Sequence, residues 1–292
     1  MNSVEQSKLI DGRSLARKVL DEAARKVAVI KERTGVTPAL ATIIVGDDPA
    51  SHTYVRMKRK RCRDVGMEPI RVELPLGTTT EELVTEVTRL AEDPCVHGIL
   101  LQHPVPKPID RRTAFETIPL DKDVDGVTSA ALGRLILGLP AFSPCTPLGI
   151  MRLLREYDVE LVGAEAVVIG RSPILGRPMA SMLINAHATV TLCHSKTRNL
   201  ANLIRRADIV IAAVGKPRYI KGSWIKPGAV VIDAGYNEGI IGDVDFESAL
   251  SRASLITPVP GGVGPMTIAV LIDQTINAAA QQLGVSFDSD NT

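Results

Sequence analysis

Residues 166–183 read AVVIGRSPILGRPMASML, an apolar run followed by two glycines, a serine and a helical pattern. Gly170, Ser172 and Gly176 therefore lie between a predicted strand and the opening of a predicted helix. Free N–H groups at a helix start attract a phosphate, and small residues let the backbone approach it closely. The stretch predicts a pyrophosphate site, although its GxSxxxG spacing departs from GxGxxG and a strand-to-helix turn without a ligand is the alternative.

The strand predicted at 188–193 gives a second indication of a dinucleotide. It is followed directly by His194, Ser195, Lys196, Thr197 and Arg198. NAD enzymes usually carry an acidic residue near this point, which holds the ribose 2′-hydroxyl. Hydroxyls and cations in its place suit a 2′-phosphate, so the sequence favours NADP over NAD.

The rest of the chain alternates strand and helix patterns in the manner of an α/β protein. Helical spacing is found at 14–34, 51–66 and 80–93, each opening on a Ser or Thr suited to cap a helix. Apolar runs predict further strands, which we expect to be parallel, at 39–46, 70–76, 96–102, 207–215 and 228–235. The first half therefore reads as β-α-β with right-handed crossovers.

Two domains are expected from the length of 292 residues and the hydrophobic content of 45%. The stretch GLPAFSPCTP at 138–147 lies between the two strand series, and its prolines and glycine indicate the junction. We expect residues 1–143 to form the first domain and 144–271 a Rossmann-like domain. An apolar helix predicted at 266–283 could return to the first domain, which would then include 272–292.

Composition limits the partners of this protein. Lys and Arg number 34 against 33 acidic residues, so no global field attracts nucleic acid or an anionic membrane. Aromatic residues, at 3%, are too scarce for base-stacking platforms. The four cysteines form no CxxC pair, which argues against a metal site or a disulfide framework. No apolar run is long enough for a membrane span or signal segment, so a cytoplasmic protein with a small-molecule partner is expected.

Several longer motifs make the sequence recognisable: VVIGRSPILGRPMA, ATVTLCHSKT, ADIVIAAVGKP and TPVPGGVGPMT. They resemble the bifunctional methylenetetrahydrofolate dehydrogenase/methenyltetrahydrofolate cyclohydrolase family. In the first half, the family's SxxYxxxK pattern is present as Ser51, Tyr54 and Lys58, and its GILxQxPxP pattern includes Gln102. The family's KDVDG pattern covers 122–126, and the resemblance runs in order from residue 11 to 275.

The resemblance implies a folate domain, a Rossmann-like NADP domain, a cleft between them and a homodimer. It implies oxidation of 5,10-methylenetetrahydrofolate with NADP to 5,10-methenyltetrahydrofolate, followed by hydrolysis to 10-formyltetrahydrofolate. The resemblance implies a role in one-carbon metabolism, with purine biosynthesis as the expected use of the product and formyl-methionine synthesis as the alternative. No metal is implied.

The same resemblance assigns the site residues. Lys58 is the cyclohydrolase catalytic residue, Gln102 its hydrogen-bonding partner, Tyr54 the ring that packs on the folate and Asp125 the carboxylate that anchors the pterin. Substrate contacts are expected from Ser51, Tyr54, Asp125, Pro260, Gly261 and Gly262. Cofactor contacts are expected from Gly170, Arg171, Ser172, Gly176, His194, Ser195, Ala213, Val214, Gly215, Ala234, Tyr236 and Thr267.

The residue types suit this chemistry, although each has a plainer interpretation. Tyr54 and Lys58 share one face of a helix, but without the resemblance Lys58 reads as part of a solvated basic face at 56–63. A partly desolvated lysine could instead move a proton to or from the attacking water. Asp125 alone reads as a turn carboxylate, yet it could accept the donor pair of a pterin. The family's pattern favours Asp125 over the nearby Asp123.

Hydride transfer needs the nicotinamide beside the methylene carbon rather than an acid or base. The glycine-rich stretch 257–267 could form a floor where both ligands approach the backbone, or could simply be a loop before a helix. Thr267, at the expected start of that helix, could reach the cofactor or be an ordinary helix-start hydroxyl.

Three residues depart from the family's usual pattern. His103 replaces a common leucine and is interpreted as a residue at the mouth of the site rather than a second proton carrier. Ala234 and Tyr236 also differ, which bears on cofactor affinity and on the balance between the two activities. A monofunctional dehydrogenase is one alternative, which the presence of both Lys58 and Gln102 opposes. A catalytically silent nucleotide-binding module is the other, and intact Lys58 and Asp125 oppose it.

Overall fold

The computed structural model describes residues 8–287, which form two compact units. Helices α2 (Gly12–Thr34) and α11 (Val263–Gln282) each contribute residues to both units. Within the described residues, unit 1 comprises 8–17, 134–139 and 144–267, and unit 2 comprises 18–133, 140–143 and 268–287.

The sheet of unit 2 has three parallel strands, β1 (Ala39–Val45), β2 (Glu68–Leu74) and β3 (Gly98–Leu101), in the order β2-β1-β3. β1 is central and all its residues are buried, as its unbroken apolar sequence predicts. β2 forms an edge, where exposed positions alternate with covered ones. Because the strands are parallel, their carboxyl ends meet at one edge of the sheet.

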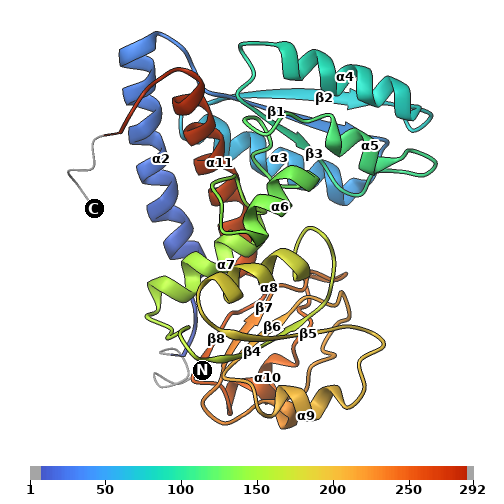
Figure 1. Cartoon of the computed structure of the whole chain (residues 1–292), viewed down its shortest axis with the longest axis vertical. Coiled ribbons are helices and arrows are strands. Elements are labelled where there is room, and N and C mark those ends of the chain that lie inside the picture. Colours follow the sequence, from blue (N-terminus) through green and yellow to red (C-terminus); the bar gives the residue numbers. More distant parts are fainter. Residues whose placement is uncertain (1–7, 288–292) are drawn as a thin grey trace. The chain divides into compact units, whose positions relative to one another are not determined.

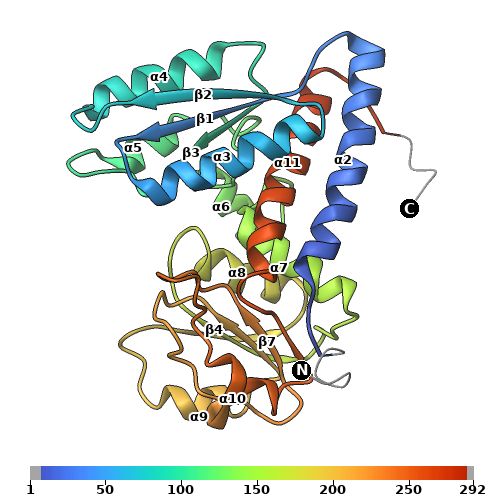
Figure 2. The same cartoon turned by 180° about the vertical axis from the view of Figure 1, so that it is seen from behind.

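Helices α3 (Pro49–Asp64) and α4 (Thr80–Glu92) cover opposite faces of this sheet (Figures 1 and 2). Right-handed crossovers in opposite directions, from β1 to β2 and from β2 back past β1 to β3, require this arrangement. The apolar face of α4 packs with side chains of β1 and β3 in one core, which includes Leu83, Val87, Leu90, Ala41, Ile43, Val45, Ile99 and Leu101. The shorter helices α5 (Arg111–Glu116) and α6 (Ser129–Ile136) follow β3 along the chain.

The helix caps differ in part from the sequence prediction. Thr79 caps α4 through a reciprocal pair of hydrogen bonds with Glu82. At α3, however, the cap is Asp48, whose carboxylate accepts the N–H of Ser51 at 2.7 Å. Asp11 accepts the N–H of Ser14 at 3.2 Å in the same way. The expected Ser caps at 14 and 51 are therefore wrong, because an aspartate three residues upstream takes the role.

The parts of α2 and α11 that belong to unit 2 run side by side in both views (Figures 1 and 2). Lys26 of α2 donates to the carboxylate of Asp273 at 3.0 Å. Gln274 is 4% exposed, and its amide donates to the carbonyls of Val124 and Ser143, both at 2.8 Å. Its oxygen accepts the Ser143 N–H at 3.0 Å. The prediction that the C-terminal helix returns to the first domain is confirmed.

Replacing Gln274 with leucine is expected to lower the free energy of unfolding by about 2–4 kcal/mol. One buried and two partly buried backbone groups lose their partners, at up to about 1–3 kcal/mol each, and the added apolar surface of leucine offsets part of that cost. Calorimetry would measure the effect and would resolve the units if they unfold separately. Gln281→Leu, an exposed position on the same helix, is the control. Equal melting temperatures for the two variants would contradict the prediction.

Unit 1 contains five parallel strands in the order β5-β4-β6-β7-β8. They are β4 (Glu165–Ile169), β5 (Thr189–Cys193), β6 (Ile209–Ala212), β7 (Val230–Asp233) and β8 (Leu255–Ile256). The chain goes from β4 to β5 on one side and then crosses to β6 on the other, so the strand order reverses between β4 and β6. In doubly wound sheets, ligands bind at the carboxyl ends beside such a reversal. The predicted two-domain α/β fold with parallel sheets is confirmed.

The helices of unit 1 are α7 (Cys145–Glu156), α8 (Gly176–Asn185), α9 (Leu200–Ile204) and α10 (Phe246–Leu250), with the 3₁₀ turn η1 (Gly222–Trp224). The strands bury a shared apolar core that includes Val167, Ile169, Val210, Ala212, Val231 and Ile256. Sequence analysis did not identify α5, α6, α7, α9, α10 or β8. Within the described residues, no helix combines the length and apolarity needed to cross a membrane.

The N-terminal segment extends the sheet of unit 1. Leu9 forms a parallel bridge with Ile256 of β8, and the Ile10 N–H donates to the Ile256 carbonyl at 2.9 Å. Gly12 follows, and its backbone lies so close to Gly262 that a Cβ at position 12 would overlap the Gly262 carbonyl oxygen. The first and last thirds of the chain therefore meet at this edge of the sheet.

Candidate functional site

Lys58, Gln102 and His103 form a chain of hydrogen bonds in unit 2. Lys58 lies on α3 and is 9% exposed, so it does not belong to a solvated face. Its Nζ donates to Oε1 of Gln102 at 2.9 Å, and Nε2 of Gln102 donates to the His103 carbonyl at 2.7 Å. Gln102 follows β3 directly, and its N–H donates to Ile43 of β1 at 2.9 Å. The sheet edge therefore orients the amine through a neutral partner.

Ser51 and Tyr54 share the face of α3 that carries Lys58, at the spacing expected of one helix face. Ser51 is buried, and its hydroxyl lies 2.7 Å from the Asp48 carboxylate and 3.2 Å from the His103 carbonyl. Tyr54 is half-buried. A hydroxyl, an aromatic ring and an amine thus follow one another along the side of α3 that faces the residues after β3.

The two aspartates of the KDVDG motif have different environments. Asp123 is fully buried, and its two oxygens accept the N–H groups of Val127 and Thr128, both at 3.0 Å. Burial raises the pKa of Asp123 despite these hydrogen bonds. Asp125 is only half-buried. Both oxygens of Asp123 are therefore used in hydrogen bonds to the loop backbone, so Asp125 is the carboxylate of this motif that suits a ligand.

His103 packs against Phe115, with ring centroids 5.0 Å apart. Burial lowers the pKa of His103, the charge of Asp125 opposes that shift, and Arg111 and Lys58 add to it. The imidazole is therefore biased towards its neutral form. Its Nε2 is buried and has no hydrogen-bond partner among the described residues, so a polar ligand atom could satisfy it.

Most of the residues expected to contact the cofactor lie in unit 1 after four neighbouring strands, β5, β4, β6 and β7. They are Gly170, Arg171 and Ser172 after β4, His194 and Ser195 after β5, Ala213, Val214 and Gly215 after β6, and Ala234 and Tyr236 after β7. Parallel strands bring these positions to one edge of the sheet, at and around the reversal of strand order. The structure therefore places together residues that are up to 66 positions apart in the sequence.

The turn between β4 and α8 requires its glycines. Gly170 has a φ of 129°, and a Cβ there would overlap the Ala213 carbonyl oxygen. A Cβ at Gly176, the first residue of α8, would overlap the Gly170 carbonyl oxygen. The N-cap of α8 is Leu175, which offers no side-chain cap. The Gly176 N–H donates instead to the Ser172 hydroxyl at 3.4 Å, and the Arg177 N–H to the Ser172 carbonyl at 3.1 Å.

A second tight turn follows β5. The His194 N–H donates to the Thr197 hydroxyl at 2.8 Å, and the Lys196 N–H donates to Nδ1 of His194 at 3.1 Å. Ser195 and Lys196 are exposed in this turn. The Gly170 N–H donates to the Cys193 carbonyl at 2.9 Å, which joins the turn to the end of β4. A hydroxyl and a cation thus stand beside the glycine turn, as a 2′-phosphate requires.

One functional arrangement was missed by the sequence analysis. The carboxylate of Asp243 accepts the N–H groups of Val214 at 2.6 Å, Gly215 at 2.9 Å and Lys216 at 2.9 Å. The N–H groups of Val214 and Gly215 are therefore occupied by the protein itself. Val214 and Gly215 can contact a cofactor through their carbonyl oxygens and apolar atoms, but their N–H groups cannot donate to it. Nothing in the sequence links position 243 to 214–216, apart from an Asp in a glycine-rich stretch.

The glycine-rich loop before α11 is closely packed. Gly261 has a φ of 116°, and a Cβ at Gly262 would crowd Thr257 and the Pro258 carbonyl. Pro260 is exposed beside them. Thr267 is not at the helix start, because α11 already begins at Val263. The expected helix-start position is therefore wrong. The Thr267 hydroxyl lies 3.0 Å from that of Thr146.

The comparison with protein families matches both halves of this arrangement. The tetrahydrofolate dehydrogenase/cyclohydrolase catalytic domain matches residues 10–125, and the NAD(P)-binding domain of the same family matches residues 144–283. The chain belongs to this family. Lys58, Gln102 and Asp125 fall in the match to the catalytic domain, and the four strand ends of unit 1 fall in the match to the NAD(P)-binding domain.

Individual members of the tetrahydrofolate dehydrogenase/cyclohydrolase family are similar over almost the whole chain. Bifunctional protein FolD 1 of Streptomyces avermitilis is 59% identical over 285 residues, covering 98% of this chain and 99% of the relative. The bifunctional FolD crystal structure from Campylobacter jejuni has a TM-score of 0.92 and 45% identity, covering 94% and 98% of the two chains. The FolD of Trypanosoma brucei, complexed with NADP and an inhibitor, has a TM-score of 0.90 and 40% identity, covering 94% and 97%.

Proposed function

We propose that this protein oxidises 5,10-methylenetetrahydrofolate with NADP and then hydrolyses the methenyl product to 10-formyltetrahydrofolate. The observation that carries the proposal is the buried Lys58 amine, held at 2.9 Å by the Gln102 side chain at the carboxyl end of β3. A dehydrogenase alone has no need of a buried amine in this place, whereas a hydrolase needs a proton carrier. The relatives described as bifunctional FolD support the same conclusion.

The residues after the four strands of unit 1 fit NADP. Gly170 and Gly176 permit the tight turn before α8 at which a pyrophosphate would approach the backbone, and Ser195 and Lys196 suit a 2′-phosphate. When bound, NADP supplies the acceptor for the hydride. The protein's part in that step is to position the reactants, because hydride transfer requires no acid or base.

Hydrolysis depends on Lys58. In its neutral form the amine takes a proton from the water that attacks the methenyl carbon. As the bond from that carbon to N5 breaks, this proton passes to N5. The second proton of the water leaves the new hydroxyl for solvent, and the carbon remains on N10 as a formyl group. Gln102 accepts one N–H of the amine and so directs it without adding a charge.

We further propose that Asp125 accepts the donor pair of the pterin ring and that Tyr54 packs against that ring. Asp125 is half-buried while Asp123 is tied to backbone N–H groups, which supports the choice between them. Ser51, Pro260, Gly261 and Gly262 complete the proposed substrate contacts. Ala213, Val214, Gly215, Ala234, Tyr236 and Thr267 complete the proposed cofactor contacts, together with Arg171, Ser172 and His194.

Two assays on the wild-type protein test the function. Methenyltetrahydrofolate, followed at its own absorbance, should form when methylenetetrahydrofolate and NADP are added. Added methenyltetrahydrofolate should decay faster with the protein than without it, in the absence of any cofactor. Formation without accelerated decay would identify a monofunctional dehydrogenase. Failure of both reactions would leave the catalytically silent nucleotide-binding module.

We also propose a cytoplasmic homodimer that serves purine biosynthesis, with a folate domain at 1–143 plus 272–292 and an NADP domain at 144–271. Residues 1–7 and 288–292 of that folate domain lie outside the described residues. The family matches at 10–125 and 144–283 support a division near residue 143, and the grouping of 268–287 with unit 2 supports the return of the last helix. Four free cysteines support a reducing compartment. Light scattering should give twice the mass of one chain, and a monomer would contradict the dimer.

A further inference from the structure

Asp243 is a fully buried carboxylate at which two loops of unit 1 meet. Besides the three N–H groups of Val214–Lys216, it accepts the side-chain amide of Asn237 at 3.0 Å. Val214 and Gly215 donate to Oδ2, while Lys216 and Asn237 donate to Oδ1. One loop follows β6 and the other follows β7, so a single side chain joins the turns at two neighbouring strand ends.

The three successive N–H groups of 214–216 form a concave donor site of the kind that elsewhere receives a phosphate. In this protein the carboxylate of Asp243 fills that site. The turn therefore has its shape before any ligand is present, and Gly215, at a φ of 64°, takes the left-handed conformation this shape requires. A turn that is already ordered need not lose conformational freedom when a ligand binds.

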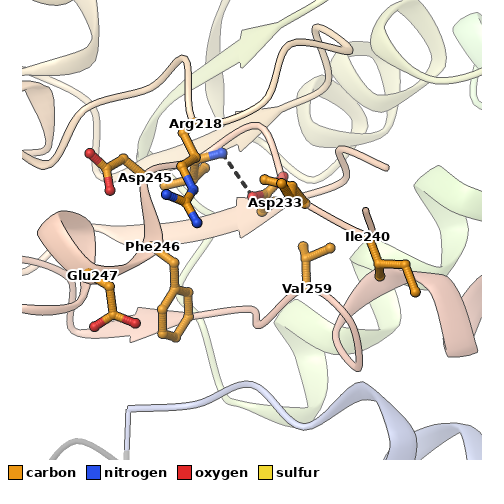
Figure 3. Close-up of a pocket in the computed structure, with 10 residues that line it drawn as sticks. Arg218, Asp233, Ile240, Asp245, Phe246, Glu247 and Val259 are labelled. Carbon is orange, nitrogen blue, oxygen red and sulfur yellow. Dashed lines mark hydrogen bonds between the residues drawn. The ribbon is translucent and has the colours of Figure 1, made fainter. Parts of the chain in front are cut away.

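Asp243 is in turn fixed to the end of β7 by Asp233. The carboxylate of Asp233 accepts the N–H groups of Asp243 and Val244, both at 2.9 Å. Burial raises the pKa of Asp233 to about 6, with the charge of Asp243 as a smaller cause in the same direction. Figure 3 shows Asp233 beside Arg218, whose N–H donates to the Gly242 carbonyl at 2.9 Å. The segment after β6 is thus held at both ends by residues 242–243.

Two glycines make room for these carboxylates. A Cβ at Gly235 would collide with the carboxylate of Asp243, and a Cβ at Gly242 would collide with that of Asp233. Glycine is therefore required at positions 235 and 242 because any side chain there would displace one of the two carboxylates. The segment between β7 and α10 is a packed support for the turn after β6.

We propose that Asp243 is the positioning residue of the cofactor site: it holds the Val214–Lys216 turn against the segment that carries Tyr236, so that both receive NADP in a preformed arrangement. The inference rests on the proposed function for the identity of the ligand. It goes beyond that function by assigning to Asp243, which does not touch the cofactor, control over the affinity for it.

Asp243→Asn tests the assignment with almost no change in size. The new amide group must face either Val214 and Gly215 or Lys216 and Asn237, so donors meet donors on one side. We expect the Kd and KM for NADP to rise by about tenfold or more, since charge-assisted hydrogen bonds are lost. The turnover number at saturating NADP and the cofactor-free hydrolysis of methenyltetrahydrofolate should change little. Asp245→Asn, which removes only a partly exposed ion pair with Lys221, is the matched control.

Hydrogen exchange separates this inference from the proposed function. Amides 214–216 should be protected in the wild type and lose protection in Asp243→Asn, while amides of β4 keep theirs. Unchanged exchange, or an unchanged Kd for NADP, would overturn the inference. A wild type that binds no NADP would refute the proposed function, and the exchange result would still decide the role of Asp243 in the turn. If Asp243→Asn does not fold, Asn237→Ala should give a smaller shift in the same direction, and no shift would overturn the inference.

Discussion

Lys58→Met is expected to lower the rate of methenyltetrahydrofolate hydrolysis by about 10²- to 10⁴-fold, the range typical of a lost general acid or base. Methionine is unbranched and apolar and matches the lysine stem up to Cε, so packing on α3 should be kept. Oxidation of methylenetetrahydrofolate should continue, because hydride transfer uses no proton carrier. Methenyltetrahydrofolate should then accumulate when substrate and NADP are supplied, and its absorbance measures this directly.

Lys60→Met is the control for this variant. Lys60 lies on the same helix two residues further on and is exposed, whereas Lys58 is 9% exposed and bonded to Gln102. Both variants lose one lysine amine from α3, so a general effect of removing a basic side chain from this helix would appear in both. If Lys58→Met hydrolyses its substrate at the wild-type rate, the proposed role of the amine is wrong, even though the family assignment stands.

Gly176→Ala is expected to weaken NADP binding by about 10²-fold or more. The added methyl group would overlap the Gly170 carbonyl oxygen and approach the Arg171 backbone, so the turn between β4 and α8 must move. Overpacking of this kind also costs about 1–3 kcal/mol of stability. Cofactor titration by fluorescence and a melting curve would measure the two effects. Cofactor-free hydrolysis should persist in whatever fraction remains folded.

Gly133→Ala provides the comparison for this second variant. Gly133 lies in α6, and a Cβ added there meets no heavy atom within 4 Å. Alanine is the better helix former, so this change should leave NADP binding alone and stabilise the helix slightly. Equal affinities for NADP in Gly176→Ala and Gly133→Ala would show that the glycine turn has no part in the cofactor site.

Strands β1, β3, β4, β6 and β7 were predictable because they are buried on both faces and so read as unbroken apolar runs. Their carboxyl ends were predicted too far along the chain. The runs at 207–215 and 228–235 remain apolar beyond β6 and β7, but Ala213–Gly215 and Ala234–Gly235 already form the turns. Apolarity reports burial, whereas the end of a strand depends on where hydrogen bonding to the next strand stops.

The catalytic residues could be named from the sequence because their motifs are short and contiguous, but their environment could not. The hydrogen-bond partner of the buried Lys58 amine is Gln102, which lies 44 residues away in the sequence. Asp243 was missed for the same reason, since its partners at 214–216 are at least 27 residues distant. The short helices α5, α9 and α10 were missed because five or six residues are too few for a helical period to stand out.

The pairing of Leu9 with Ile256 has a consequence for how the chain is made. Lys8 and Leu250, whose amine and carbonyl are 3.3 Å apart, are separated by 242 residues of sequence. During synthesis, Lys8 must therefore wait for 242 further residues before its partner exists. The sheet of unit 1 can assemble around β4 and β6 in the meantime, but its last edge closes late. Contacts of such long range slow folding, so the N-terminal segment is the part of unit 1 that we expect to dock last.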